Sequence, residues 1–328
     1  MENSTRRTFL KTGALAALSL LTKSCSGRTS EPDASPSGAG TGSDALHPST
    51  RNGSAHSHRG IKLGVIDING TYGGLAMPAE LAAVEKAARI GFEGLEITFG
   101  GPDERGLLRL AHPDRMALYK QELQTHGIQP AGTHLFVLHE NKLKDRSDPL
   151  ARRWVEQAIP ATRELGTEVV LLPFFGDAAI ESRREQEYVA GVLADLGAMA
   201  AEYGVVLGLE NSLSAEDNMR LLERTDSEAV KIYYDVGNSI YFGYDIYEEL
   251  KWLGSKPICQ IHIKDHPFEK HYLGKGIIDF DRVFERIDQI GYTGWLVLET
   301  HAPSGDIAAD MQRNLAYVRR QLAVNISD

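Results

Sequence analysis

Short β-branched runs alternate with longer amphipathic segments along most of this chain, and this alternation limits the possible folds more than any other feature. From about Lys62 onward, apolar runs of strand length recur at residues 62–68, 94–97, 130–137, 168–174, 205–210, 231–236, 258–263 and 295–299. A helix-like segment follows each run. Strands that alternate with helices predict a parallel sheet, because parallel neighbours need a crossover connection. Eight such units in about 265 residues are typical of a closed (β/α)8 TIM barrel, an α/β fold.

An open, doubly wound sheet is the alternative fold for the same alternation. That fold usually carries a glycine-rich phosphate loop directly after its first strand. Here the first run continues into Asp67-Ile68-Asn69-Gly70, which does not match that fingerprint. The closed barrel is therefore the favoured prediction.

Acidic and histidine side chains recur at the carboxyl ends of the predicted strands, where barrel enzymes place their active sites. Four successive runs in the second half of the chain carry, at or one residue before their ends, Glu210, Asp235, His262 and Glu299. Three carboxylates gathered at one rim repel each other, and a cation relieves that repulsion. Carboxylate oxygens with one imidazole suit Mn²⁺, Co²⁺ or Mg²⁺, with Zn²⁺ as an alternative. The pattern favours a metal-dependent enzyme over a binding module.

Two more polar residues lie toward the ends of the second and third runs. Glu96 and His134 occupy the same rim and are candidates for contacts with a substrate. A buried, hydrogen-bonded structural role is an equally good interpretation of His134.

The overall charge argues against a nucleic-acid partner. The formal net charge is -10, and the folded part contains no block of Lys and Arg. Proteins that bind polyanions normally present a basic face. The two cysteines, Cys25 and Cys259, lie in a predicted leader and a predicted strand, so a structural disulfide is not expected.

Residues 1–25 are predicted to be a twin-arginine export signal. Arg6-Arg7 precede an apolar stretch at 12–22, which is too short for a permanent span of about 20 residues. This predicts the twin-arginine export machinery as a partner and a periplasmic location. A lipid anchor on Cys25 is an alternative that Lys23 disfavours. Residues 26–59 are rich in Ser, Gly and Pro and are predicted to be a disordered linker, with the catalytic barrel at 60–328.

Several motifs in the folded part are moderately specific alone and strong in their combined order and spacing. They are Leu209-Glu210-Asn211, Tyr234-Asp235-Val236-Gly237-Asn238, His262-Ile263-Lys264-Asp265, Leu273-Gly274-Lys275-Gly276 with Asp279-Phe280, and Gly291-Tyr292-Thr293-Gly294-Trp295 leading to Glu299. In these motifs the chain resembles the xylose-isomerase-like TIM-barrel superfamily, specifically its sugar phosphate isomerase/epimerase group.

The resemblance implies roles for the residues that match. The positions of Glu210, Asp235, His262 and Glu299 bind Mn²⁺ or Co²⁺ in the ketose 3-epimerases of this group. Glu210 and Glu299 also exchange the substrate proton from opposite faces.

Further matching positions imply contacts around this centre. Glu216 and Asn238 match substrate-contacting positions, although several epimerases carry a histidine where this chain has Asn238. Lys264 is expected to contact substrate or pair with a carboxylate of the site. Asp265 is expected to accept a hydrogen bond from His262 and so orient it.

The expected function is therefore isomerisation or epimerisation of a small, unphosphorylated sugar through a metal-bound enediolate. A lyase or dehydratase acting on a keto-sugar, keto-inositol or 3-keto-glycoside is the alternative enzyme. A non-catalytic exported sugar-binding protein is the alternative of another class. A homo-oligomer is compatible with all three.

Overall fold

A computed structural model of the protein describes residues 60–67, 80–267 and 271–325. The predicted export signal at 1–25 and the predicted linker at 26–59 lie outside these ranges. In the part of the chain that is described, no helix has both the length and the apolar character needed to cross a membrane.

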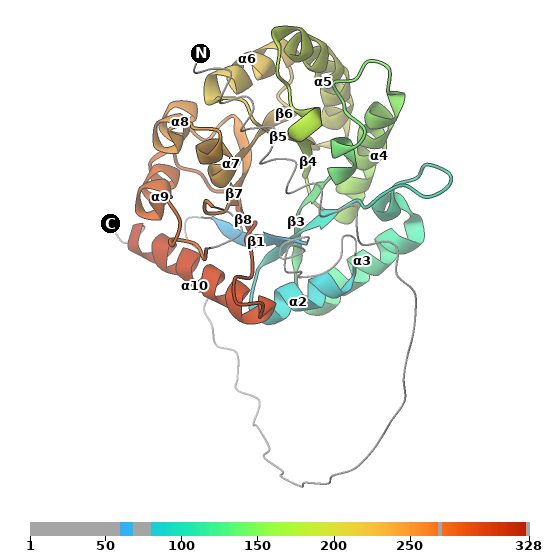
Figure 1. The fold of residues 1–328 in the computed structure, drawn as a ribbon. Coiled ribbons are helices and arrows are strands. Elements are labelled where there is room, and N and C mark those ends of the chain that lie inside the picture. The colour runs from blue at the N-terminus through green and yellow to red at the C-terminus, as the bar shows by residue number, and fades with distance from the viewer. Residues whose placement is uncertain (1–59, 68–79, 268–270, 326–328) are drawn as a thin grey trace, which may run out of the picture. The chain divides into compact units, whose positions relative to one another are not determined.

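Parallel strands pair in sequence order, from the first to the eighth, and close into a barrel (Figure 1). The strands are β1 (Lys62–Ile66), β2 (Gly94–Thr98), β3 (Gln129–His134), β4 (Val169–Phe174), β5 (Val206–Asn211), β6 (Val230–Asp235), β7 (Ile258–Ile263) and β8 (Trp295–Leu298). Pairing of β1 with β8, with Leu63 opposite Leu296, closes the ring. The predicted (β/α)8 barrel is confirmed.

Helices surround the strands on the outside of the barrel (Figure 1). They are α2 (Ala82–Ile90), α3 (Pro113–His126), α4 (Pro149–Leu165), α5 (Arg183–Tyr203), α6 (Ala215–Thr225), α7 (Val236–Tyr241), α8 (Ile246–Leu253), α9 (Phe280–Gln289) and α10 (Ile307–Asn325). Short 3-10 turns occur at Arg109–Ala111, Phe136–His139 and Gly176–Ala178. The apolar stripes of the helices and the outward side chains of the strands form one large buried core.

The carboxyl ends of β3 and β6 differ from the sequence-based expectation, and both differences shape the rim. The third strand was expected to reach residue 137, but it ends at His134 because the chain turns at Leu135 into a 3-10 helix. The short helix α7 was not expected. Asp235 caps it, since its carboxylate accepts hydrogen bonds from the backbone N–H groups of Gly237 and Asn238 at 2.8 and 2.9 Å.

Alternation along the strands decides which side chains reach the barrel interior. On β6, Tyr233 and Asp235 face inward, whereas Tyr234 between them reaches outward to Glu249 of α8. Deeper in the barrel, Ile66, Ala131 and Val297 form a small apolar cluster of their own. The barrel interior therefore combines this apolar cluster with the polar residues of the rim.

Candidate metal centre

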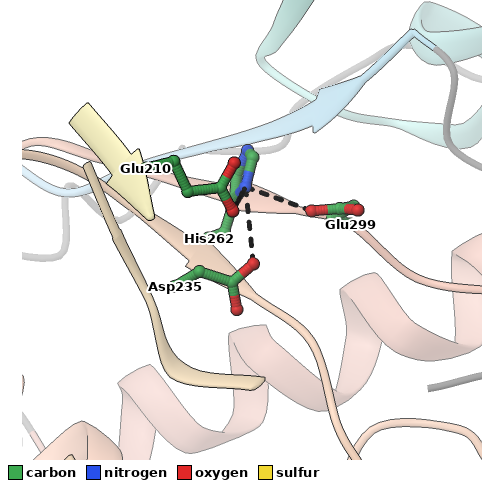
Figure 2. Close-up of side chains that lie close together, drawn as sticks. All are labelled: Glu210, Asp235, His262 and Glu299. Atoms are coloured by element: carbon green, nitrogen blue, oxygen red, sulfur yellow. Dashed lines mark hydrogen bonds and ion pairs between the residues drawn. The ribbon is translucent and has the colours of Figure 1, made fainter. Parts of the chain in front are cut away.

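Four side chains converge at the carboxyl ends of four neighbouring strands (Figure 2). Glu210 lies in β5, Asp235 ends β6, His262 lies in β7, and Glu299 directly follows β8. One ligand atom from each residue lies within 4.8 Å of those of the other three. Residues that are 89 positions apart in the sequence (299 − 210) therefore share one point in the fold.

The imidazole of His262 occupies the middle of this cluster. Its Nδ1 atom lies 3.2 Å from Glu299 Oε2, 3.4 Å from Glu210 Oε1 and 3.7 Å from Asp235 Oδ2. One ring nitrogen thus faces three carboxylates. This arrangement brings one nitrogen and three oxygen donors to a common point, a donor set that fits a divalent cation such as Mn²⁺, Co²⁺, Mg²⁺ or Zn²⁺.

Burial and crowding separate the proton affinities of the three carboxylates. Burial raises the pKa of Glu210 to about 8; Asp235 and Glu299 add to that rise, and His262 opposes it. Burial alone would also raise the pKa values of Asp235 and Glu299. Lys264 and His262 outweigh it and hold the pKa values of both carboxyls below their ordinary range. The site therefore concentrates negative charge that positive neighbours stabilise.

Lys264 supplies one of these positive charges. Its ammonium lies 2.9 Å from Asp235 Oδ2 and 2.9 Å from Glu299 Oε2, in a buried position. The glycine at position 237 makes room for it, because a Cβ atom there would overlap Cγ of Lys264. The glycine of the Asp-Val-Gly-Asn motif is therefore explained by packing, because the side chain of Lys264 lies directly against its backbone.

Asn238 completes the side of the cluster next to Glu210. It lies in the first turn of α7, whose start is set by the Asp235 cap, and its Nδ2 donates to Glu210 Oε1 at 2.9 Å. The structure thus places this candidate substrate residue against the cluster. Its amide can donate to and accept from a sugar hydroxyl but cannot transfer a proton.

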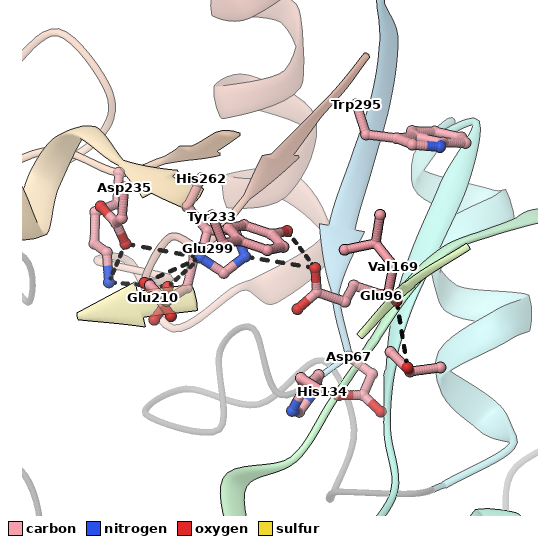
Figure 3. A network of polar contacts seen from close by, with 12 residues as sticks. Asp67, Glu96, His134, Val169, Glu210, Tyr233, Asp235, His262, Trp295 and Glu299 are labelled. Atoms are coloured by element: carbon pink, nitrogen blue, oxygen red, sulfur yellow. Dashed lines mark hydrogen bonds and ion pairs between the residues drawn. The ribbon is translucent and has the colours of Figure 1, made fainter. Parts of the chain in front are cut away.

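Glu96 and His134 are both fully buried, and each side chain contacts another side chain of the protein. Glu96 accepts a hydrogen bond from Tyr233, and its Oε2 lies 3.6 Å from His262 Nε2. His134 Nε2 lies 2.9 Å from Asp67 Oδ1 (Figure 3). Asp67 was not among the sequence candidates, because it fell inside the expected first strand. That strand ends at Ile66, which places Asp67 at the rim beside the others.

The structure corrects the expectation for Asp265. This residue was expected to accept a hydrogen bond from His262, but its two oxygens instead accept from the backbone N–H groups of His266, Gly274, Lys275, Gly276 and Ile278. The strand ends at Ile263, so Asp265 already lies in the following loop. It organises that loop rather than the histidine.

The expectation for Glu216 is also corrected. Its side chain is 72% exposed and lies 3.8 Å from Arg220 on the same helix. Ser214 caps α6, and the helix turns Ala215 and Asn218 toward the protein, which leaves Glu216 on the solvent side. Glu216, six residues after Glu210, therefore does not join the cluster.

The fold and the buried acidic cluster define a (β/α)8 barrel with a candidate metal site at its strand ends. A family model described as a xylose isomerase-like TIM barrel matches residues 84–321. The chain therefore belongs to the xylose isomerase-like TIM barrel family.

Relatives of known activity match over much of the barrel. A 2-epi-5-epi-valiolone 7-phosphate 2-epimerase of Actinoplanes sp. is 31% identical over 199 residues, which cover 58% of this chain and 69% of the relative. The L-ribulose-5-phosphate 3-epimerase UlaE of Escherichia coli O139:H28 is 26% identical over 271 residues, or 76% of this chain and 93% of the relative. A solved L-ribulose 3-epimerase superposes with a TM-score of 0.65 at 19% identity, covering 81% of this chain and 95% of its own.

Proposed function

We propose that this protein is a divalent-metal-dependent epimerase or isomerase of a small sugar. The observation that carries the proposal is the convergence of Glu210, Asp235, His262 and Glu299 within 4.8 Å of one another. Carboxylates at this spacing repel one another, and a bound divalent cation would relieve that repulsion beyond what Lys264 provides. The epimerase names of the relatives supply the reaction class.

The proposed chemistry is proton transfer next to a carbonyl group. A bound divalent cation would stabilise negative charge on the substrate oxygens. Glu210 and Glu299 extend from β5 and β8, and so approach the centre from different sides of the rim (Figure 2). One carboxylate removes the proton from the sugar carbon and the other returns a proton on the opposite face, which inverts that carbon. Asn238 and Lys264 would hold substrate hydroxyl groups by hydrogen bonds.

The substrate is proposed to be unphosphorylated. The curated relatives are named for phosphorylated substrates, whereas the superposed L-ribulose 3-epimerase is named for a free sugar. Our reason for the free sugar is the proposed export signal with Arg6-Arg7, since phosphorylated sugars are mostly cytoplasmic. We accordingly propose that the barrel acts in the periplasm.

Metal analysis followed by a substrate panel tests this proposal. The purified protein should contain a near-stoichiometric divalent metal, with Mn²⁺ expected. Assays in D₂O on free ketoses and their phosphates should show deuterium incorporation at the inverted carbon, with a preference for free sugars. Release of water or of an alcohol from a keto-inositol or a 3-keto-glycoside would instead identify a lyase. No deuterium incorporation with any of these compounds would refute the enzymatic proposal.

A single substitution separates an enzyme from a sugar-binding protein. Glu299→Gln keeps the size of the side chain but removes its ability to take up a proton, so turnover should fall by about 10²–10⁴-fold. Sugar binding, measured by calorimetry with the product ketose, should weaken far less. The matched control is Glu216→Gln, which changes an exposed glutamate and should leave turnover unaltered. Equal turnover in Glu299→Gln and wild type would show that this carboxylate transfers no proton.

A further inference from the structure

Two buried side chains lie behind His262, on the side away from the three carboxylates (Figure 3). They are Glu96, in β2, and Tyr233, in β6. The hydroxyl of Tyr233 donates to Glu96 Oε2, and the same oxygen lies 3.6 Å from His262 Nε2. None of these three residues is more than 2% exposed. A carboxyl group and a phenol are thus enclosed in the barrel directly against the imidazole.

The two nitrogens of His262 face different surroundings. Nδ1 faces Glu210, Asp235 and Glu299, whereas Nε2 faces Glu96. A ring nitrogen binds a cation only through its lone pair, so a neutral imidazole that binds through Nδ1 carries its proton on Nε2. That proton then needs an acceptor inside the barrel.

Glu96 is suited to be this acceptor. Among the described residues, His262 Nε2 and Glu96 Oε1 have no hydrogen-bond partner, and both atoms are buried. The separation of 3.6 Å between Nε2 and Oε2 is slightly longer than a hydrogen bond, and a small rotation of the carboxylate closes it. The oxygen facing Nε2, Glu96 Oε2, already accepts from Tyr233, but a carboxylate oxygen can accept a second hydrogen bond, so it can serve the unpartnered Nε2.

Tyr233 restrains both partners. Its hydroxyl holds the carboxylate of Glu96, and its ring lies 4.5 Å from the imidazole ring, centroid to centroid, at an angle of 59°. In this contact the phenol of Tyr233 is the donor and Glu96 Oε2 is the acceptor. The imidazole is thereby limited in both its rotation and its choice of acceptor.

We propose that Glu96 and Tyr233 are a positioning pair, which holds His262 with its proton on Nε2 and its Nδ1 lone pair directed at the metal centre. This inference rests on the metal site of the proposed function. In this arrangement Glu96 contacts His262 and does not contact the sugar. Neither residue would touch the substrate, so the pair would act through His262 alone.

Metal affinity is the direct test. Glu96→Leu removes the acceptor and should raise the dissociation constant for Mn²⁺ by about 10–100-fold in calorimetry, the usual effect of losing such a partner. Glu96→Gln keeps an uncharged oxygen that still accepts from Nε2, so its dissociation constant should lie between those of Glu96→Leu and wild type. Tyr233→Phe keeps the carboxylate and should weaken binding by only a few-fold.

The chain contains a matched control pair on the opposite face of the same strand. Tyr234 donates to Glu249 Oε2 at 2.9 Å, outside the barrel and away from the imidazole. Glu249→Leu and Glu249→Gln also remove a carboxylate from a buried tyrosine, yet they should leave the Mn²⁺ dissociation constant within about twofold of wild type. A general loss of packing would weaken metal binding in both pairs alike.

The tautomer provides a second readout that does not depend on activity. In ¹⁵N-histidine-labelled protein loaded with diamagnetic Zn²⁺, the spectrum should show a proton on Nε2 of His262 and a metal-bound Nδ1. Wild-type affinity in a folded Glu96→Leu variant, equal losses in the Glu249 variants, or a Zn²⁺-bound Nε2 would overturn the positioning pair. Should Glu96→Leu not fold, Glu96→Gln and Tyr233→Phe decide the question. A wild-type protein that binds no divalent cation would instead overturn the metal centre itself.

Discussion

Single residues decide the charge balance at the rim of the barrel. Lys264 is the clearest case, because one buried ammonium lies 2.9 Å from each of two carboxylates. The sequence predicted that Lys264 would contact substrate or pair with a carboxylate of the site, and the structure shows it pairing with two, Asp235 and Glu299. The alternation along β7 and its continuation places the His262 and Lys264 side chains at the same rim.

Replacing Lys264 with Met should unbalance this site. The change leaves the carboxylates of Asp235 and Glu299 without their ammonium partner and should cost about 3 kcal/mol of unfolding free energy in metal-free protein. Adding Mn²⁺ should raise the melting temperature more in the variant than in wild type, because a bound cation replaces the missing charge. Thermal unfolding with and without Mn²⁺ measures both effects.

An exposed lysine serves as the comparison for that measurement. Lys120 lies 3.3 Å from Glu164 at the surface, and Lys120→Met should change stability by less than about 1 kcal/mol, with no dependence on Mn²⁺. Similar behaviour of the two variants would mean that Lys264 does not balance the acidic cluster.

At the scale of elements, the loop after β7 is organised by a single carboxylate. Asp265 accepts backbone hydrogen bonds from residues 274, 275, 276 and 278, and from its neighbour His266. The glycine at 276 allows this, because a Cβ there would overlap the carboxylate. The Leu-Gly-Lys-Gly motif therefore reflects the close approach of the loop backbone to Asp265.

Removing this carboxylate should loosen the loop. In Asp265→Ala the backbone N–H groups of residues 274, 275, 276 and 278 lose their carboxylate acceptor, so hydrogen exchange in peptides covering 271–278 should accelerate by more than about tenfold. Mass spectrometry of exchange measures this directly. Asp265→Asn keeps one acceptor oxygen and should give a smaller change. Unchanged exchange in Asp265→Ala would show that other contacts hold the loop.

Prediction of the elements themselves succeeded where one local signal dominated. The strands that carry Glu210 and His262, β5 and β7, were located within one residue, since continuous apolar runs mark buried parallel strands. Helix α7 was missed because its six residues, Val236–Tyr241, are too few to show a helical period. The available signal for a helix start was Asp235, which caps α7, but an aspartate at this position was also expected as a metal ligand.

At the scale of the whole molecule, closure of the barrel depends on how tightly its inner side chains pack. Trp295 of β8 lies inside, against the backbone of Gly94 in β2, and a Cβ at position 94 would lie 2.5 Å from its ring. The barrel therefore requires the smallest residue at this point, because packed interiors accommodate extra atoms poorly.

Gly94→Ala should accordingly destabilise the entire barrel. Overpacking against Trp295 should cost about 1–3 kcal/mol of unfolding free energy, measured by urea denaturation. The metal affinity of the folded variant should stay close to that of wild type, because position 94 lies two residues below the rim residue Glu96. Gly101→Ala, where an added Cβ meets no neighbour within 4 Å, is the comparison and should cost less. A stable Gly94→Ala barrel would indicate that the tryptophan repacks freely.

The amino-acid sequence by itself determined the succession of strands and helices, and with it the identity of the four residues that converge at the rim. Both follow from local periodicity and from the rule that parallel strands align their carboxyl ends. Only the tertiary structure decided the partners of these residues: Lys264 between two carboxylates, Glu96 and Tyr233 behind His262, and Asp265 in its loop. Which groups meet inside a closed barrel depends on strand register, bulges and the exact ends of strands, and these arise from packing across the whole ring rather than from any one segment.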